Sequence, residues 1–453
     1  MSNSMVNDLT QGRVARQLIL FTLPLAASNL LQVLYNLVDM IVIGRFVGST
    51  GLSGVSIGGD LMHIPMFIGI GFSGAAQIIV AQLVGKKDRE GVNRAIGTSF
   101  SFILGMSLVC TALFLIFRNQ LLDWMNTPAE ARQQALNYSV VCFWGMFFIF
   151  GYNAVSAILR GMGDSTRPFV FIGVATVVNV VLDLVFVGLM QLDAMGAALA
   201  TVIGQAVSFV GSLIYLYRRR EQFGFDFKPA SFRIDRSVLL PLVKLGVPMM
   251  LQSMAITISS LFVNAWVNAY GVTASAVTAV GGKLRNTASV ITNSLCTATA
   301  SMTGQNMGAG RIDRVRRTVG VSVLINAAAF VLWAVAFLAF PRQIFGFFTT
   351  DPEVLDWART FMYTNVVSIL CMCMMSSFNG LITGVGNATL SFIIGMLDGV
   401  VARVGIALLL GRVMGMGILG FWWGNALAGF FTAIPGIVYY FTGRWEHREL
   451  VVR

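Results

Sequence analysis

Two carboxylates of this chain lie within long apolar stretches, where a negative charge is costly. Asp39 lies in LLQVLYNLVDMIVIG, residues 30 to 44, and Asp183 lies in VVNVVLDLVFV. A charged side chain near the centre of a bilayer costs at least about 2.5 to 3.5 kcal/mol, so such residues usually face a cavity, pair with a partner or bind an ion. We therefore examine both carboxylates as candidate ion-binding groups.

Amide side chains accompany both carboxylates at helical spacing. Steps of 3, 4 and 3 place four residues on one helix face: Asn29, Gln32, Asn36 and Asp39. Asn179 lies one turn before Asp183. Carboxylate and amide oxygens that converge in an apolar bundle would either share a proton or coordinate a hard cation such as sodium. The alternative is that both carboxyl groups are protonated or hydrogen-bonded packing residues.

The elements that must position these residues are membrane-spanning helices. The chain has 453 residues, of which 56% are hydrophobic and 11% charged, and its mean hydropathy is +0.76. A helix needs about 20 apolar residues to cross a hydrocarbon core of about 30 Å. Twelve segments satisfy this length, at 17–43, 53–80, 95–117, 135–159, 169–190, 196–217, 239–268, 272–300, 318–340, 358–380, 390–411 and 417–441. We expect an all-α polytopic membrane protein.

The basic residues predict the orientation of these spans. The side that both termini share carries 22 Lys and Arg residues, the opposite loops carry 6, and 3 lie within spans. By the positive-inside rule, both termini are cytoplasmic. Topology and anionic lipid headgroups then explain the net charge of +11, so it gives no reason to expect a nucleic-acid partner.

Several other functions find no support in the sequence. The five cysteines all fall within spans and there are only two histidines, which argues against a disulfide framework, a metal centre or another cofactor. No nucleophile with a base appears, so we expect no enzyme. Two G-x-G-x-x-G matches, 69–74 and 415–420, lie in or at the ends of spans and are interpreted as helix packing. No Walker A sequence occurs, which leaves an ion gradient as the common energy source.

The chain contains an internal repeat. One constant shift along the sequence places Gln82 on Gln305, Arg94 on Arg317 and Gly161 on Gly384. We expect two homologous, pseudo-symmetric six-helix bundles. Because six is even, both bundles enter the membrane from the same side and are parallel. Such a pair would expose a central cavity alternately to each face of the membrane. The expected boundaries are an N-terminal lobe at 1–217, a cytoplasmic linker at 218–238, a C-terminal lobe at 239–441 and a tail at 442–453.

Other polar or adaptable residues within spans have an open role. Asp60, Lys283, Arg285, Asp398 and Arg403 would form interhelical pairs or extend their charges to the membrane surface. Methionines gather on two spans, at 249, 250, 254, 372, 374 and 375. Met254 and its neighbours suit a promiscuous cavity, although packing against lipid explains them equally well.

Several motifs in order resemble one family over essentially the whole chain. They are TLPLAASNLLQVLYNLVDMIVIG, AQLVGKKDREGVNRAIG and its echo GQNMGAGRIDRVRRTVG, ILRGMGDSTRP, and LITGVGNAT. Together they resemble the multidrug and toxic compound extrusion (MATE) family, and are most similar to its bacterial DinF-like branch. The resemblance implies a multi-pass protein of the bacterial inner membrane that exports organic cations and other amphiphilic small molecules in exchange for protons or sodium ions. We expect it to be a monomer, although the sequence leaves the oligomeric state open.

The resemblance also assigns roles to residues of this chain. It implies a cation-coupling site formed by residues of the N-terminal lobe: Asp39, Asn179, Asp183 and Thr201. It further implies that Pro24 bends the first helix and that Tyr35 and Asn153 line the substrate cavity. We expect Gln32 and Asn36, on the polar face of the first helix, to line the same cavity. The NorM-like branch carries acidic residues in two second-lobe helices, and here LGVPMMLQSMAITISS and NVVSILCMCMMSSFNG have none. We therefore expect coupling to rest on the first lobe.

Two rival functions stay open at this point. One is a flippase for lipid-linked oligosaccharide, from the same superfamily, which would need basic residues to bind its anionic cargo. Lys283 and Arg285, two basic residues within a span, keep this alternative open. A receptor or scaffold without transport activity is the other, and the internal repeat and the carboxylates within spans argue against it.

Overall fold

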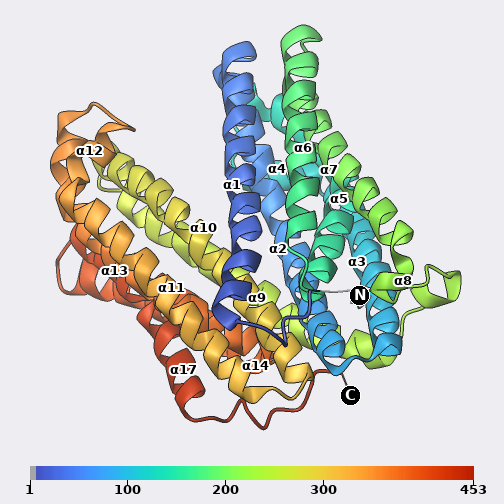
Figure 1. Cartoon of the computed structure of the whole chain (residues 1–453). Helices are drawn as coiled ribbons and strands as arrows, with labels where there is room; N and C mark the ends of the chain where they lie inside the picture. Colours follow the sequence, from blue (N-terminus) through green and yellow to red (C-terminus); the bar gives the residue numbers. More distant parts are fainter. Residues whose placement is uncertain (1–6, 453) are drawn as a thin grey trace. The chain divides into compact units, whose positions relative to one another are not determined.

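The computed structural model describes residues 7 to 452, and over that range the chain is built from helices and their connections (Figure 1). The elements of the first repeat are α1 (Val14–Phe46), α2 (Ser49–Lys86), α3 (Arg89–Ile116), α4 (Arg118–Trp124), α5 (Ala129–Gly161), α6 (Thr166–Asp183) with the π-helical η1 (Leu184–Leu189), and α7 (Asp193–Arg218). Two short helices follow in the connection, α8 (Arg220–Phe223) and η2 (Pro229–Phe232).

The second repeat has the same order of elements. They are α9 (Arg236–Asn268), α10 (Val272–Gly308), α11 (Ile312–Ala339), α12 (Pro341–Gly346), α13 (Pro352–Gly384), the segment α14 (Ala388–Met396), η3 (Leu397–Val404), α15 (Gly405–Leu408) and η4 (Leu409–Val413), and finally α16 (Ile418–Leu427) and α17 (Phe430–Phe441). The starts of α3 and α11, and likewise those of α5 and α13, are related by the same shift that relates Gln82 to Gln305. The predicted two-repeat helical fold is confirmed.

Eleven helices of the described chain are long and apolar enough to cross a membrane. The twelfth expected span, α10, is long enough but does not reach the same apolarity. Many polar side chains in its second half are packed inside the protein, and the fully buried ones are Thr299, Ser301, Thr303, Gln305 and Asn306. The polar groups at this end of α10 are therefore shielded by the protein, whereas Lys283, Asn286 and Asn293, earlier in the helix, are exposed.

The helices form two compact units. The first is built mainly from Leu23–Val247, and the second from Leu9–Thr22 together with Pro248–Val451. Helix α1 therefore changes unit just before Pro24, and α9 changes unit at Pro248. Helix α1 is continuous through Pro24, where proline removes one backbone hydrogen bond. The bend expected at Pro24 stays a prediction.

In the second unit, the segment that leads into α1 is held by one buried arginine. The Arg314 side chain is 8% exposed and donates hydrogen bonds to the carbonyl oxygens of Gly12 at 2.8 Å, Leu9 at 3.1 Å and Gln11 at 3.2 Å. It also donates to the Gln17 side-chain oxygen at 3.0 Å. Arg314 thus fixes the path of the chain before the first span.

In the first unit, the connection between the repeats is held against α3. The amide of Asp235 donates to the Thr98 hydroxyl at 3.1 Å, and Asp235 lies 3.7 Å from Arg94. Hydrogen bonds from the hydroxyl and amide of Ser237 lower the pKa of Asp235, and Arg94 contributes to the same direction. The approach of this connection requires Gly97, since a Cβ there would lie 1.7 Å from the Ser231 carbonyl oxygen.

We expect Arg314→Met to expose the segment before α1 to protease. Without Arg314, the carbonyl oxygens of Leu9, Gln11 and Gly12 lose their charged donor. Cleavage after Arg13 and Arg16 by trypsin should then rise about tenfold or more, the factor that a loss of about 1.4 kcal/mol gives. Limited trypsin digestion followed by mass spectrometry measures this. Arg311→Met is the matched control, because Arg311 is exposed; equal cleavage of both variants would contradict the role of Arg314.

Candidate cation-coupling site

Asp39 and Asp183 come together in the first unit. Asp39 lies on α1 and is 6% exposed, whereas Asp183 ends α6 and is 0% exposed. Their carboxyl groups lie close enough to interact directly, and Asn179 also interacts with Asp183. The predicted convergence of the two carboxylates with an amide is therefore present.

Most polar atoms of the cluster form no hydrogen bond within the described chain. Among the residues that the structure describes, no hydrogen-bond partner is found for Oδ1 of Asp39, either carboxyl oxygen of Asp183, or either polar atom of the Asn179 amide. Two ionised carboxylates buried side by side repel each other and have lost their hydration. A bound proton or a small cation held by oxygen atoms would satisfy both groups, and both ligands fit this set of side chains.

A hydrogen bond joins α1 to α7 next to the carboxylates. The Tyr35 hydroxyl donates to the Thr201 hydroxyl oxygen at 2.8 Å, and the charge of Asp39 acts on Tyr35. Thr201, expected as a coupling residue, thus lies beside the cluster through Tyr35, which was expected to line the cavity. A change at Asp39 can therefore affect α7 through the side chain of Tyr35.

A glycine allows α7 to approach α6 at the level of Asn179. A Cβ added at Gly204 would lie 3.0 Å from the Ala175 carbonyl oxygen and 3.4 Å from Cβ of Asn179. The approach to the Ala175 carbonyl oxygen is tighter than normal packing, so the absence of a side chain at Gly204 allows α7 to lie this close to α6. The close approach of the two helices therefore occurs at the level of Asn179.

Two residues of the cluster were missed from the sequence. Tyr138 and Cys142, one turn apart on α5, are buried, and the charge of Asp39 acts on both. Helix α2 packs closely here, since a Cβ at Gly58 would lie 2.5 Å from the Tyr138 ring. The available signal was a tyrosine and a cysteine at helical spacing in the span predicted at 135–159, which alone is common in apolar helices.

The other residues expected in the cavity do not join the carboxylate cluster. Gln32 and Asn36 are exposed on α1. The Asn153 amide donates to the Ile149 carbonyl oxygen of its own helix at 2.9 Å. Met254 is half-buried and belongs to the second unit. Their predicted contact with substrate stays a prediction.

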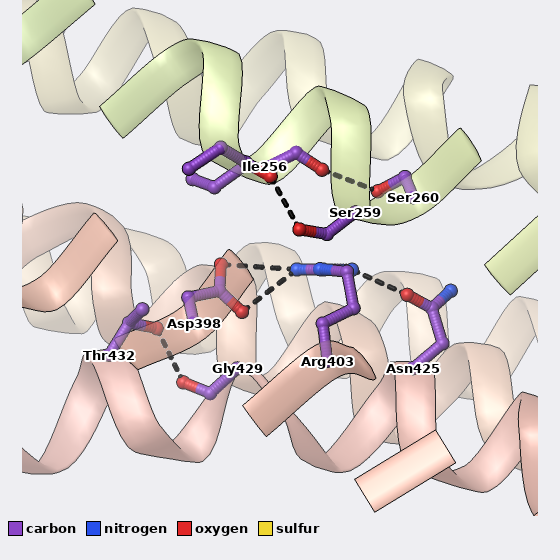
Figure 2. A network of polar contacts seen from close by, with 9 residues as sticks. Ile256, Ser259, Ser260, Asp398, Arg403, Asn425, Gly429 and Thr432 are labelled. Carbon is purple, nitrogen blue, oxygen red and sulfur yellow. Dashed lines mark hydrogen bonds and ion pairs between the residues drawn. The ribbon is translucent and has the colours of Figure 1, made fainter. Parts of the chain in front are cut away.

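The second unit contains a different polar network around an ion pair (Figure 2). Nη2 of Arg403 donates to both carboxyl oxygens of Asp398, at 3.0 and 3.1 Å, and Nη1 donates to the Asn425 side-chain oxygen. Asp398 is 2% exposed. The ion pair lies within the π-helical η3, while the bond to Asn425 reaches α16, so only part of this network is interhelical as expected.

The remaining charged residues within spans differ in their exposure. Arg285 is half-buried on α10, and its positive charge acts on Arg403. Asp60 and Lys283 are exposed. Two arginines thus accompany the single carboxylate of Asp398 in this part of the second unit.

We expect Tyr35→Phe and Thr201→Val each to slow transport a few-fold. Either change removes the 2.8 Å hydrogen bond, whose net contribution is about 0.5 to 1.5 kcal/mol. Since both variants lose the same bond, the double variant should be no slower than the slower single variant. Initial rates in proteoliposomes measure this. Effects that multiply in the double variant would show that the two hydroxyls act separately.

A family model and several known proteins match this chain. The model described as MatE matches residues 24–185 and 248–398. The probable multidrug resistance protein YoeA of Bacillus subtilis is 28% identical over 442 residues, which cover 96% of this chain and 95% of that protein. The probable multidrug resistance protein YpnP of the same organism is 27% identical and covers 98% of each chain.

The fold also matches solved structures. The outward-facing conformation of a multidrug resistance MATE family transporter of the MOP superfamily aligns with a TM-score of 0.89. It covers 96% of each chain at 22% identity. At this identity the match establishes the fold alone, and that fold is the arrangement of two repeats described above.

Proposed function

Because the chain belongs to the MATE family, we propose that it is a secondary active antiporter that exports organic cations or amphiphilic compounds in exchange for protons or sodium ions. It is a multi-pass membrane protein. The observation that carries the coupling proposal is the pair of buried carboxylates, Asp39 and Asp183, whose oxygens include three without a hydrogen-bond partner in the described chain. The names of the two Bacillus relatives support multidrug export as the activity.

In the proposed cycle, ion and substrate compete for one conformation. Binding of protons or sodium ions from outside neutralises Asp39 and Asp183, changes the packing of α1 around Pro24, and disfavours bound substrate. Release of the ion inside restores the affinity for substrate. Each ligand drives the other only through its difference in affinity between the two conformations. Tyr35 and Thr201 extend the change from α1 to α7.

The proposed location is the bacterial inner membrane with both termini in the cytoplasm. The distribution of Lys and Arg supports this orientation. The proposal includes a monomer that needs no cofactor other than the coupling ion and carries out no enzymatic reaction.

A second candidate function is a flippase for lipid-linked oligosaccharide. The observation that favours it is the excess of positive charge in the second unit, where Arg285 and Arg403 accompany Asp398. An anionic pyrophosphate group would find a partner there. The buried carboxylates of the first unit argue for the antiporter instead.

Efflux from proteoliposomes tests the antiporter directly. A fluorescent organic cation is loaded, and a proton gradient or a sodium gradient is imposed separately. Efflux that follows one gradient identifies an antiporter and its ion. Efflux that follows neither, at the level of protein-free liposomes, would overturn the proposal and favour the flippase, to be examined with Lys283→Gln and Arg285→Gln.

A further inference from the structure

The two repeats differ in what covers equivalent faces of α3 and α11. In the first unit, Gly97 of α3 is covered by Ser231 of the connection between the repeats. Its equivalent in the second repeat is Gly320 of α11, where an added Cβ would meet no atom of the described chain within 4 Å. The helix face that the connection covers in the first repeat is therefore open in the second repeat, as far as the described residues extend.

The open face of α11 is part of a pocket of about 600 Å³. The residues that line it all belong to the second unit, and they include Arg13, Arg317, Gly320, Val321 and Leu324. Helical spacing places Arg317, Gly320, Val321 and Leu324 on one face of α11. The pocket thus has a basic end, near the start of the span, and an apolar end further along it.

The basic end lacks the counter-charge that its equivalent has in the first unit. Arg94 lies 3.7 Å from Asp235, but the equivalents of these two residues are Arg317 and Gly12. Within the described chain, no hydrogen bond or ion pair engages the guanidinium groups of Arg13 and Arg317, and both residues are exposed. An anion from outside the chain would supply the missing charge.

The apolar end of the pocket also lacks the groups that bind the connection in the first unit. Thr98 and Ser101 of α3 hydrogen-bond the backbone of the connection, at Asp235 and Phe232. Their equivalents on α11 are Val321 and Leu324, which offer no hydrogen bond, and Leu324 is 70% exposed. The first face is suited to a polypeptide backbone, whereas the second is suited to a hydrocarbon chain.

We propose that this pocket binds an anionic phospholipid of the cytoplasmic leaflet, with its phosphate at Arg13 and Arg317 and an acyl chain along Gly320, Val321 and Leu324. Basic pockets beside spans on the cytoplasmic side are suited to anionic headgroups, and the apolar end continues into the bilayer. The proposal uses the orientation given above and is independent of the transported substrate. Bound lipid would hold the segment before α1 against α11, and so stabilise the protein.

The test is the thermal stability of the full-length protein in a neutral detergent. We expect added phosphatidylglycerol to raise Tm by several degrees, while phosphatidylcholine and water-soluble glycerol phosphate leave it unchanged. The double variant Arg13→Gln, Arg317→Gln should lose this rise. The matched control is Arg16→Gln, Arg311→Gln, which removes the same charge from exposed arginines outside the pocket and should keep it.

Three outcomes would overturn the proposal. A rise that persists in the Arg13, Arg317 variant, or an equal rise with phosphatidylcholine, would mean that the pocket does not recognise an anionic lipid. An equal rise with glycerol phosphate would assign the site to a soluble phosphate. A rise that occurs only after residues 1–6 are deleted would mean that this segment of the chain occupies the pocket. None of these measurements depends on transport, so a failure here is distinct from a failure of the antiporter.

Discussion

Replacement of Asp39 and Asp183 together by asparagine is expected to reduce gradient-driven efflux to the background of protein-free liposomes. Asparagine keeps the size of each side chain but cannot take up a proton or supply a carboxylate oxygen to a cation. Because both carboxyl groups serve one coupling site, each single variant should lose most of the activity that the double variant loses. Efflux driven by each gradient measures this.

The matched control for this prediction is Asp60→Asn. Asp60 is also a carboxylate within a span, but its side chain is exposed, and this variant should transport at nearly the rate of the unmodified protein. A double variant of Asp39 and Asp183 that transports at that same rate would contradict the coupling proposal. A thermal melt of each variant establishes that lost efflux reflects lost coupling and not unfolding.

Arg403→Met is expected to be one of the most destabilising single changes in the second unit. It leaves the Asp398 carboxylate, which is 2% exposed, without its charged partner. Breaking a buried ion pair on one side costs about 3 to 5 kcal/mol, whereas replacing both partners by apolar residues is often neutral or stabilising. Thermal melts in detergent should therefore show a large fall in Tm for Arg403→Met.

The double variant Asp398→Leu, Arg403→Met is the control for this stability prediction. It should recover most of the Tm that Arg403→Met loses, since the buried Asp398 carboxylate is no longer left without its partner. If the double variant were as unstable as the single variant, the pair would contribute through packing rather than charge. Recovery of Tm without recovery of transport would assign Asp398 and Arg403 a part in the transport cycle.

Features with a large energetic cost were predictable from the sequence. Long apolar runs indicated the spans, and the constant shift that relates Gln82 to Gln305 indicated the repeat that α3 and α11 then follow. Asp39 and Asp183 were found because a carboxylate inside a span is rare. The sequence does not specify how their helices pack. However, two carboxylates that both avoid lipid must face the interior of the same bundle, which brings them close together.

Features that cost little, or that depend on unusual backbone, were not predictable. Tyr138 and Cys142 are buried within range of the charge of Asp39, but neither residue type is exceptional in an apolar helix. Asp398 and Arg403 are five residues apart, a spacing that points to different faces of an α-helix. The π-helical η3 brings them together, and nothing in the local sequence indicates that change of helix type.

The change of unit within α1 and α9 also determines how the protein can be divided. A cut in the connection between the repeats separates two chains of similar length, but neither chain contains a complete unit. The first fragment carries residues 9–22, which pack in the second unit, and lacks the start of α9, which packs in the first. The sequence repeat and the compact unit therefore have different boundaries, and each fragment completes its unit only with residues that the other fragment carries.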